Sequence, residues 1–273
     1  MRVRRLGWAG LEIEVDGETA VLDPLQDTAP LRSFIGDARE PLLAPRPGAR
    51  VALVTHLHSD HTDPAAIAAA LGPEGVLLRP EAAQGEGLEV IGTKRAEDGL
   101  AELGVPARVV APWETVTDGP FALTAVPAVD GFGDPQIGWV IGGGGRRIVA
   151  YGDTIFHGSW WLTTMRHGPF DAAFLPVNGA VVDLPHRQPP SPLTASMNPE
   201  QAAVAADLLE AEIAVPVHYD TLYKPPIYIQ VDDPGGAFER ASERARVLAP
   251  GEWLELAYEP TVASPSSRNT SSA

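Results

Sequence analysis

The chain has 273 residues, 44% of them hydrophobic, and carries 20 basic against 36 acidic side chains, a formal net charge of −16. This length suits one large domain with a substantial core, and we predict a single domain over residues 1–258. The charge argues against a nucleic-acid partner and against adsorption to anionic lipid. It still permits a small anionic substrate held by one or two local cations.

Cysteine is absent, which excludes disulfides, thiolate metal ligands and a cysteine nucleophile. Any metal must therefore bind through His, Asp or Glu. The basic amino terminus leads into strand-like alternation, and no stretch reaches the roughly 18 apolar residues of a membrane-spanning helix. We expect a soluble cytoplasmic protein without membrane insertion that acts on a small molecule, with homo-oligomer formation left open.

The first 55 residues alternate between strands and loops. Leu11, Ile13 and Val15 alternate with acidic residues, and Asp16-Gly17 is a turn signal, so two or three antiparallel strands are predicted. The segment 30–50 is rich in Pro and Arg and is predicted to be a loop. The short apolar run 51–55 is typical of a buried strand.

Helix and strand signals continue along the chain. Asp63-Pro64 starts a helix that ends near residue 71, with Asp63 as N-cap, and Asn198-Pro199 starts another in the same way. Further helices are predicted over 96–103 and 238–247. Strands are predicted over 76–78, 121–126, 137–141, 147–151, 172–176, 213–216 and 253–257. The glycines of 142–145 indicate a hairpin turn, since they lack the strand-then-helix context of a phosphate-binding loop.

Two segments have no predicted helix or strand. Residues 183–196 are Pro-rich and lack hydrophobic periodicity, and a segment of this length inside a compact domain is typical of a binding loop or lid. The tail, residues 259–273, is rich in Ser and Thr and is predicted to be disordered.

Four potential metal ligands fall within six residues between the strand 51–55 and the following helix. In an extended segment, residues two apart point the same way, so His56 and His58 can reach one cation. The turn into the helix aims Asp60 and His61 at a neighbouring point. These residues are alternatively surface polar groups on a loop, but three of the seven histidines in the chain lie here. The run therefore predicts a site for two adjacent metals.

This run matches the HxHxDH motif of the metallo-β-lactamase superfamily. Other segments resemble that superfamily in order: Leu22-Asp23-Pro24, Gly152-Asp153-Thr154 and Pro216-Val217-His218-Tyr219. The resemblance then spans about residues 5 to 258. Within the superfamily, three segments look most like the branch of L-ascorbate-6-phosphate lactonase-like proteins: 175–179, Met197-Asn198 and 218–220.

The resemblance implies an α/β fold, namely a four-layer αββα sandwich with the metals at its edge. It implies that His56 and His58 hold the first metal, and that the second is held by Asp60, His61 and His218. Asp153 would bridge them. Two divalent metal ions are then expected, with zinc first and manganese or iron as alternatives.

Two positions depart from the family pattern. Where the family usually supplies a third histidine for the first metal, after Val126-Pro127-Ala128-Val129, this chain has Asp130. An aspartate ligand would shift metal preference from zinc toward manganese or iron. Alternatively, Asp130 is only a loop acid, and another residue or water takes the position. Trp8 stands where relatives often have histidine, and we predict that it packs.

The implied mechanism needs few protein residues besides the ligands. Two cations sharing Asp153 would share a water and lower its pKa toward about 7, which provides hydroxide without a protein base. One cation would polarise a carbonyl or phosphoryl oxygen of the substrate and stabilise the oxyanion. Asp60 belongs to this catalytic centre. His157 is a candidate donor to the leaving group, or else a packed or exposed residue.

Candidate substrate contacts lie on loops. They are Arg187 in the segment 183–196, Tyr223 and Lys224 after the last ligand, and Asn178, which an Asn-Gly turn explains equally. Single charges on loops are usually only solvated. The predicted function is metal-dependent hydrolysis of a small ester, lactone or cyclic amide. The alternatives are a phosphodiesterase acting on a small or lipid-derived phosphate diester, and a metal-binding protein without turnover. Retention of the other ligands argues against the latter.

Overall fold

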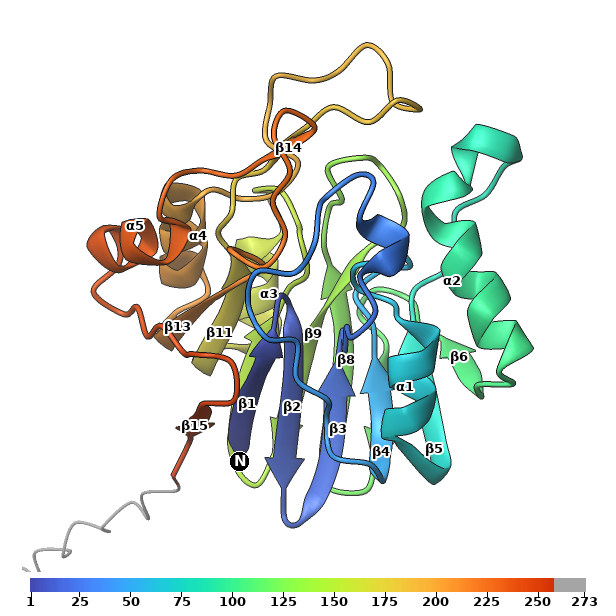
Figure 1. Ribbon diagram of the computed structural model, residues 1–273. Helices are drawn as coiled ribbons and strands as arrows, with labels where there is room; N and C mark the ends of the chain where they lie inside the picture. The colour runs from blue at the N-terminus through green and yellow to red at the C-terminus, as the bar shows by residue number, and fades with distance from the viewer. Residues whose placement is uncertain (258–273) are drawn as a thin grey trace, which may run out of the picture.

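Two mixed β-sheets face each other, and helices lie on their outer sides (Figure 1). The structure is a computed structural model that describes residues 1–257, so the predicted tail at 259–273 lies outside the described residues. The arrangement is the predicted four-layer αββα sandwich. Within residues 1–257, no helix combines the length and apolar character needed to cross a membrane.

The first sheet has seven strands in the order β15-β1-β2-β3-β4-β5-β6. Their bounds are β1 Arg2–Gly7, β2 Gly10–Val15, β3 Glu18–Leu22, β4 Ala49–Leu53, β5 Leu71–Arg79, β6 Ala107–Val109 and β15 Trp253–Glu255. The strands β3, β4, β5 and β6 are parallel to one another, whereas β15, β1, β2 and β3 are antiparallel.

The second sheet has six strands in the order β13-β11-β10-β9-β8-β7, and β12 pairs with β14 in a short ribbon. The bounds are β7 Thr115–Asp118, β8 Phe121–Pro127, β9 Ile137–Gly143, β10 Arg146–Ala150, β11 Phe170–Pro176, β12 Val181–Val182, β13 Ala211–Val217 and β14 Tyr228–Ile229. The helices are α1 Pro64–Ala70, α2 Ile91–Glu102, α3 Trp160–His167, α4 Pro199–Leu208 and α5 Pro234–Ala241.

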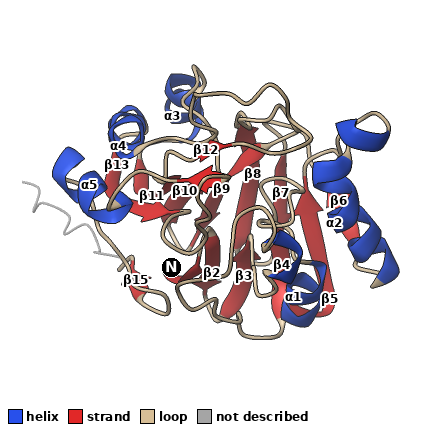
Figure 2. Cartoon of the chain, turned by 45° about the horizontal axis from the view of Figure 1, so that its top comes forward, coloured by secondary structure: helices blue, strands red, loops and turns tan. Residues whose placement is uncertain are grey.

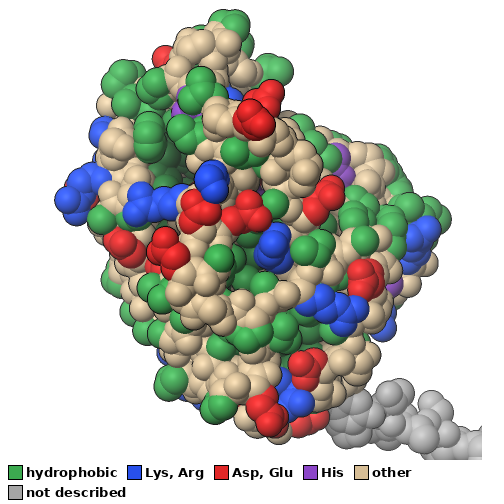
Figure 3. All heavy atoms as spheres, turned by 90° about the vertical axis from the view of Figure 1, so that its right-hand side faces the viewer, with side chains coloured by type: hydrophobic (Ala, Val, Ile, Leu, Met, Phe, Trp, Pro, Cys, Tyr) green, Lys and Arg blue, Asp and Glu red, His purple; other side chains and the backbone are tan. Residues whose placement is uncertain are grey.

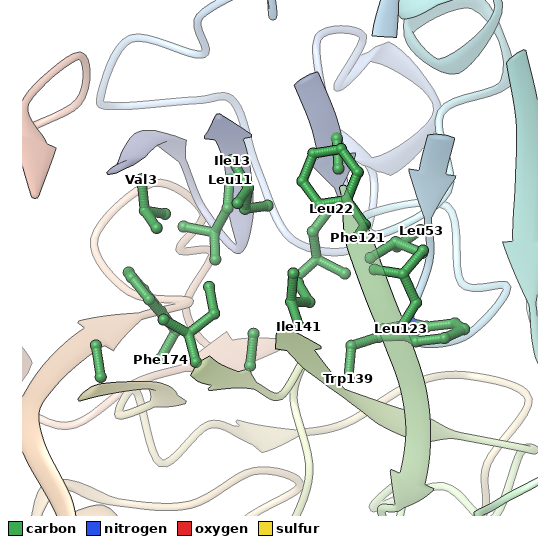
Figure 4. Close-up of a cluster of buried hydrophobic side chains, with 14 of the residues drawn as sticks. Val3, Leu11, Ile13, Leu22, Leu53, Phe121, Leu123, Trp139, Ile141 and Phe174 are labelled. Carbon is green, nitrogen blue, oxygen red and sulfur yellow. The ribbon is translucent and has the colours of Figure 1, made fainter. Parts of the chain in front are cut away.

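The main core fills the space between the two sheets. Successive side chains of a strand point to opposite faces, so Ala172 and Phe174 of β11 pack into this core while Ala173 packs outward. Figure 4 shows Phe174 and Trp139 of the second sheet facing Ile13 and Leu22 of the first. The short apolar runs of the sequence are strands buried on both faces.

Two outer clusters attach the helices to the sheets. Ile67 of α1 and Leu100 of α2 pack against the outer face of β4 and β5, with Ala52 and Leu77. On the other side α3, α4 and α5 cover β10, β11 and β13, with Trp160 and Phe238 among the buried side chains. These contacts place α1 and α2 on the right and α4 and α5 on the left of Figure 1.

Most predicted elements are confirmed. The first three strands form an antiparallel meander whose Asp16-Gly17 turn has positive φ at both residues. The glycine run makes the predicted hairpin, because Gly144 and Gly145 occupy the left-handed conformation between β9 and β10. Residues 183–196 contain no helix or strand.

Two helix predictions were displaced. The helix predicted over 96–103 runs from Ile91 to Glu102, and its first buried residue is Thr93, which precedes the predicted start. The helix predicted over 238–247 is α5, which begins after the N-cap Asp233 and ends at Ala241. The chain stops being helical there because the next residues pair with the edge of the second sheet, where Ala245 bridges Ala214.

Several short elements were not predicted, namely α3, β6, β7, β12 and β14. The last strand also ends at Glu255 rather than 257. The short strands β6 and β7 lie at sheet edges and β12 and β14 form a separate ribbon, so that pairing, rather than a strong hydrophobic period, defines them.

Loops carrying the predicted ligands meet at one edge of the sandwich (Figure 2). β10, β11 and β13 are parallel, and β8 runs the same way because both β8 and β10 are antiparallel to β9. Their carboxyl ends therefore share an edge, which faces the carboxyl end of β4. This geometry brings segments 54–63, 128–136, 151–159 and 218–227 together.

Phe174→Ala should lower the free energy of unfolding by about 3–5 kcal/mol, because Phe174 is fully buried between the sheets and its removal leaves a cavity. Urea unfolding of the two proteins measures the loss. Leu193→Ala is the control, since that leucine is 76% exposed. A loss equal to that of the control would contradict the position of Phe174 in the core.

Candidate metal centre

The histidine run leaves the first sheet where β4 ends, and local hydrogen bonds fix its turn. The carbonyl of His58 accepts from the backbone N–H groups of His61 at 3.0 Å and Thr62 at 2.8 Å. The hydroxyl of Thr62 donates to the carbonyl of His56 at 2.7 Å. Asp63 then caps α1 by accepting from two backbone N–H groups of its first turn. The turn thus presents its side chains from a rigid support.

One group of potential ligands contains His56, His58, Asp130 and Asp153, each offering an atom within 4.8 Å of the others. His56 Nε2 lies 2.9 Å from His58 Nδ1 and 3.5 Å from Asp153 Oδ1. Asp130 Oδ1 lies 3.9 Å from His58 Nδ1. The structure therefore brings Asp130 beside His58, within the first group.

A second group contains Asp60, His61 and His218, again within 4.8 Å of one another. Asp60 Oδ2 lies 3.5 Å from His61 Nε2 and 3.6 Å from His218 Nε2. The two groups are adjacent, since the ring centroids of His56 and His61 are 4.3 Å apart. All the ligands predicted from the sequence thus meet in one place.

Buried polar partners hold the opposite nitrogens of two rings. His61 Nδ1 lies 2.8 Å from Asp23 Oδ2, and Asp23 also accepts from the backbone N–H and hydroxyl of Thr55. His58 Nε2 lies 2.7 Å from Asp134 Oδ2. Such contacts select the tautomer of each ring, so that the other ring nitrogen keeps a free lone pair. The sequence did not single out Asp134, because its partner lies 76 residues away.

Small residues allow the ligand loops to approach each other. A Cβ on Gly152 would lie 2.4 Å from Thr55 Oγ1, and one on Gly131 would lie 2.2 Å from the carbonyl oxygen of Ala195. Gly152 precedes Asp153, and Gly131 follows Asp130. Any larger residue at either position would push a ligand loop away from its neighbour.

Several buried atoms of the two groups have no hydrogen-bond partner within residues 1–257. They are Asp130 Oδ1, His61 Nε2 and both ring nitrogens of His218. A buried polar atom without a partner is costly unless something else satisfies it. Imidazole nitrogens and carboxylate oxygens are ligands for zinc, manganese and iron, so these residues fit divalent metal ions.

The pKa values of the clustered carboxyl groups also indicate a cation site. Burial raises the pKa of Asp153 to about 7, with the negative charge of Asp130 adding to the effect. Burial also raises the pKa of Asp130. Against the effect of burial, the neighbouring His61 and His218 lower the pKa of Asp60. A cation between these groups would remove the repulsion among the carboxylates.

Both groups open into one cavity of about 350 Å³. Its walls are mostly apolar, with Leu31, Phe34, Ile35, Ile91, Phe132 and Leu184 among them, and Arg95, His186 and Arg187 add positive or titratable groups. The volume lies in the range of small-molecule sites. The segment 183–196 supplies part of this wall, as expected for a binding loop.

Figure 3 shows acidic and basic side chains interspersed on the face that carries α2.

Of the predicted substrate contacts, Arg187 lines the cavity, and its guanidinium donates to Asp134 at 3.0 Å. Asn178 is fully buried behind the wall, where its amide donates to the hydroxyl of Tyr228 at 2.8 Å and its carbonyl accepts from Ser196. Tyr228 and Ser196 themselves line the cavity. No local sequence pattern singles out these two residues.

Besides Asn178, three further predicted residues do not line the cavity. Tyr223 packs under the guanidinium of Arg39, and Lys224 Nζ donates to the carbonyls of Arg32 and Ser33 at 2.8 and 2.9 Å. His157 stacks on Trp160 with ring centroids 4.1 Å apart. Their substrate and catalytic roles remain predictions that this placement does not support.

Comparisons with known proteins agree with this site. Residues 19–219 match the model of the beta-lactamase superfamily domain. A UPF0173 metal-dependent hydrolase of Thermococcus kodakarensis is 30% identical over 94% of this chain and all of its own. The chain therefore belongs to the metallo-β-lactamase superfamily and, within it, to the UPF0173 metal-dependent hydrolases.

Solved structures share the fold. Igni18, a metallo hydrolase from Ignicoccus hospitalis, aligns with a TM-score of 0.64 at 20% identity, covering 94% of this chain and 99% of its own. CmlA, a diiron beta-hydroxylase from Streptomyces venezuelae, aligns with a TM-score of 0.67 at 19% identity, covering 93% of this chain and 54% of its own. At such identities the likeness shows the fold alone.

Asp23→Asn should destabilise the metal-free protein by about 1–3 kcal/mol, because an amide cannot accept all three buried hydrogen bonds that Asp23 receives. Urea unfolding in the presence of a chelator measures the effect. Asp16→Asn is a matched control, since Asp16 also has a positive φ but lies exposed in a hairpin turn. Equal stability of both variants would contradict this role of Asp23.

Proposed function

We propose that the chain hydrolyses a small ester, lactone or cyclic amide with two divalent metal ions, zinc first and manganese or iron as alternatives. The main support for the proposal is that two ligand groups lie next to each other at one cavity, and that the ligand atoms within each group are within 4.8 Å of one another. The resemblance of 175–179 and 218–220 to lactonase-like proteins supports a lactone among these substrates.

In this proposal His56, His58 and Asp130 hold one ion and Asp60, His61 and His218 hold the other. Asp153, whose carboxylate lies within 4.8 Å of the other ligand atoms of the first group, would be shared by both ions. Bound ions would supply Lewis-acid polarisation of a substrate oxygen and a water whose pKa is lowered to about 7.

Other residues of the chain orient the ligands or donate a hydrogen bond to the substrate. Asp23 and Asp134 hold His61 and His58 in the tautomers that leave a lone pair toward the cavity floor. The hydroxyl oxygen of Tyr228 accepts from Asn178, so its own proton remains free to donate to a substrate oxygen. Burial and the nearby carboxylates raise the pKa of Tyr228 well above 10, and the phenol keeps that proton.

The cavity wall supports a substrate with an apolar body, because aliphatic and aromatic side chains form most of it. Arg95 and Arg187 at the same cavity favour a second candidate, a phosphodiesterase acting on a small or lipid-derived phosphate diester, since guanidinium groups bind phosphate oxygens well. The two candidates differ in the reacting group and share the metal ligands.

Metal analysis of the purified protein should find two equivalents, and turnover assays on lactones, esters, amides and phosphodiesters should find hydrolysis that a chelator abolishes. Asp153→Ala should remove this turnover, because both ions lose a shared ligand. Asp207→Ala is the control, since its side chain is 70% exposed on the outer face of α4. Protein that binds less than one equivalent and cleaves nothing would refute the proposal, and cleavage of phosphodiesters alone would establish the second candidate.

Asp130→His should retain turnover and shift metal preference toward zinc, because imidazole replaces a hard oxygen ligand. Asp130→Ala should lower metal content and rate, since it removes the Oδ1 atom that faces His58. Competition between Zn²⁺ and Mn²⁺, followed by metal analysis, gives the preference. Unchanged metal content and rate in Asp130→Ala would show that Asp130 is not a ligand.

A further inference from the structure

Trp8 occupies an unusual backbone position in the turn between β1 and β2. Its φ is +48°, a left-handed conformation that bulky residues rarely adopt, and its side chain is completely buried. His218 has φ +59°, and its backbone N–H donates to the carbonyl of Trp8 at 3.0 Å. Backbone strain of this kind persists only where the surroundings impose it, and it concentrates at functional sites.

The side chain of Trp8 contacts two of the three residues of the second ligand group. The indole Nε1–H donates to Asp60 Oδ2 at 3.2 Å. The ring packs on the imidazole of His218 with centroids 3.8 Å apart. Asp60 Oδ2 is also the atom that lies nearest His61 Nε2 and His218 Nε2. One buried side chain therefore sets the orientation of a carboxylate and of an imidazole in the same group.

The chemistry of indole suits this task. Its N–H is a donor only, so Trp8 can neither bind a cation through that nitrogen nor change its charge. A carboxylate oxygen has two lone pairs and can accept from the indole while facing a metal ion. Groups that fix metal ligands in this way typically raise metal affinity 10–100-fold.

We propose that Trp8 is a positioning residue for the second ligand group and raises its metal affinity selectively. The inference rests on the proposed function, because it takes Asp60, His61 and His218 as a metal site. Within residues 1–257, the indole N–H of Trp8 bonds to Asp60 and its ring packs on His218, both in the second ligand group. Neither of these two contacts involves the four residues of the first group. The packing role predicted for Trp8 from the sequence is thus only part of its contribution.

Titration of the metal-free full chain with Zn²⁺ alone, in competition with a chelator, tests the inference without any substrate. Asp60→Ala identifies which binding step belongs to the second group. In Trp8→Phe, which keeps an aromatic ring but removes the N–H, we expect that step to weaken 10–100-fold. The other step should keep its wild-type affinity.

Trp139→Phe is the matched control, because Trp139 is also fully buried and loses an indole hydrogen bond, to the carbonyl of Val54. Its Zn²⁺ affinities should equal those of the wild type. Unfolding of each metal-free variant checks that the fold is intact. Wild-type affinities in Trp8→Phe, or equal weakening of both steps, would overturn the inference.

A wild-type protein that binds a single Zn²⁺ would refute the two-metal proposal, and Asp60→Ala then separates the two ideas. If Asp60→Ala removes that ion and Trp8→Phe weakens its binding, the role of Trp8 stands without the second metal. If Asp60→Ala leaves the ion in place, the second group holds none and the inference falls as well.

Discussion

Two buried carboxylates, those of Asp130 and Asp153, and the partly buried one of Asp60 lie among four histidines at one edge of the sandwich. Burying so many anionic groups together is unfavourable unless positive charge compensates them. The histidines supply part of that charge only when protonated, and a protonated ring has no lone pair for a metal. Divalent cations compensate the charge of the carboxylates and also bind the lone pairs of neutral imidazole rings. The arrangement of side chains at this edge is therefore the one that binding such cations requires.

The sheets give this edge its rigidity. The ligand loops follow β4, β8, β10 and β13, whose carboxyl ends the sandwich places together. Asp23 at the end of β3 and Asp134 before β9 then hold His61 and His58 from behind. Trp8 extends the same principle to Asp60 and His218 from the turn after β1. His58, Asp60, His61 and His218 are thus each held by their own loop and by a side chain from another part of the chain.

The cavity above the metal centre depends on segments that lie far apart in the chain. Phe34 comes from the loop before β4, Ile91 from the start of α2, and Leu184 from the segment after β12. Their apolar side chains form the wall against which we propose that an apolar substrate body packs. The metal-ligand residues and the apolar residues that line the cavity therefore come from different parts of the fold. A shared metal motif consequently says little about the substrate.

The sequence by itself determined the elements with strong local signals. The run from His56 to His61, the Asp63-Pro64 and Asn198-Pro199 helix starts, the early meander and the glycine hairpin all depend on neighbours within a few residues. Weakly patterned elements, such as α3, the edge strands β6 and β7 and the true end of α5, depend on tertiary pairing and were missed or displaced.

Only the tertiary structure decided which distant residues meet. It brought Asp130 to His58, set Asp134 behind that ring, placed Tyr228 in the cavity wall, and left Tyr223, Lys224 and His157 outside it. These contacts span tens of residues, and no local pattern encodes them. Trp8 shows the difference most clearly, because its residue type predicts packing, while its hydrogen bond to Asp60 exists only because the fold joins positions 52 residues apart.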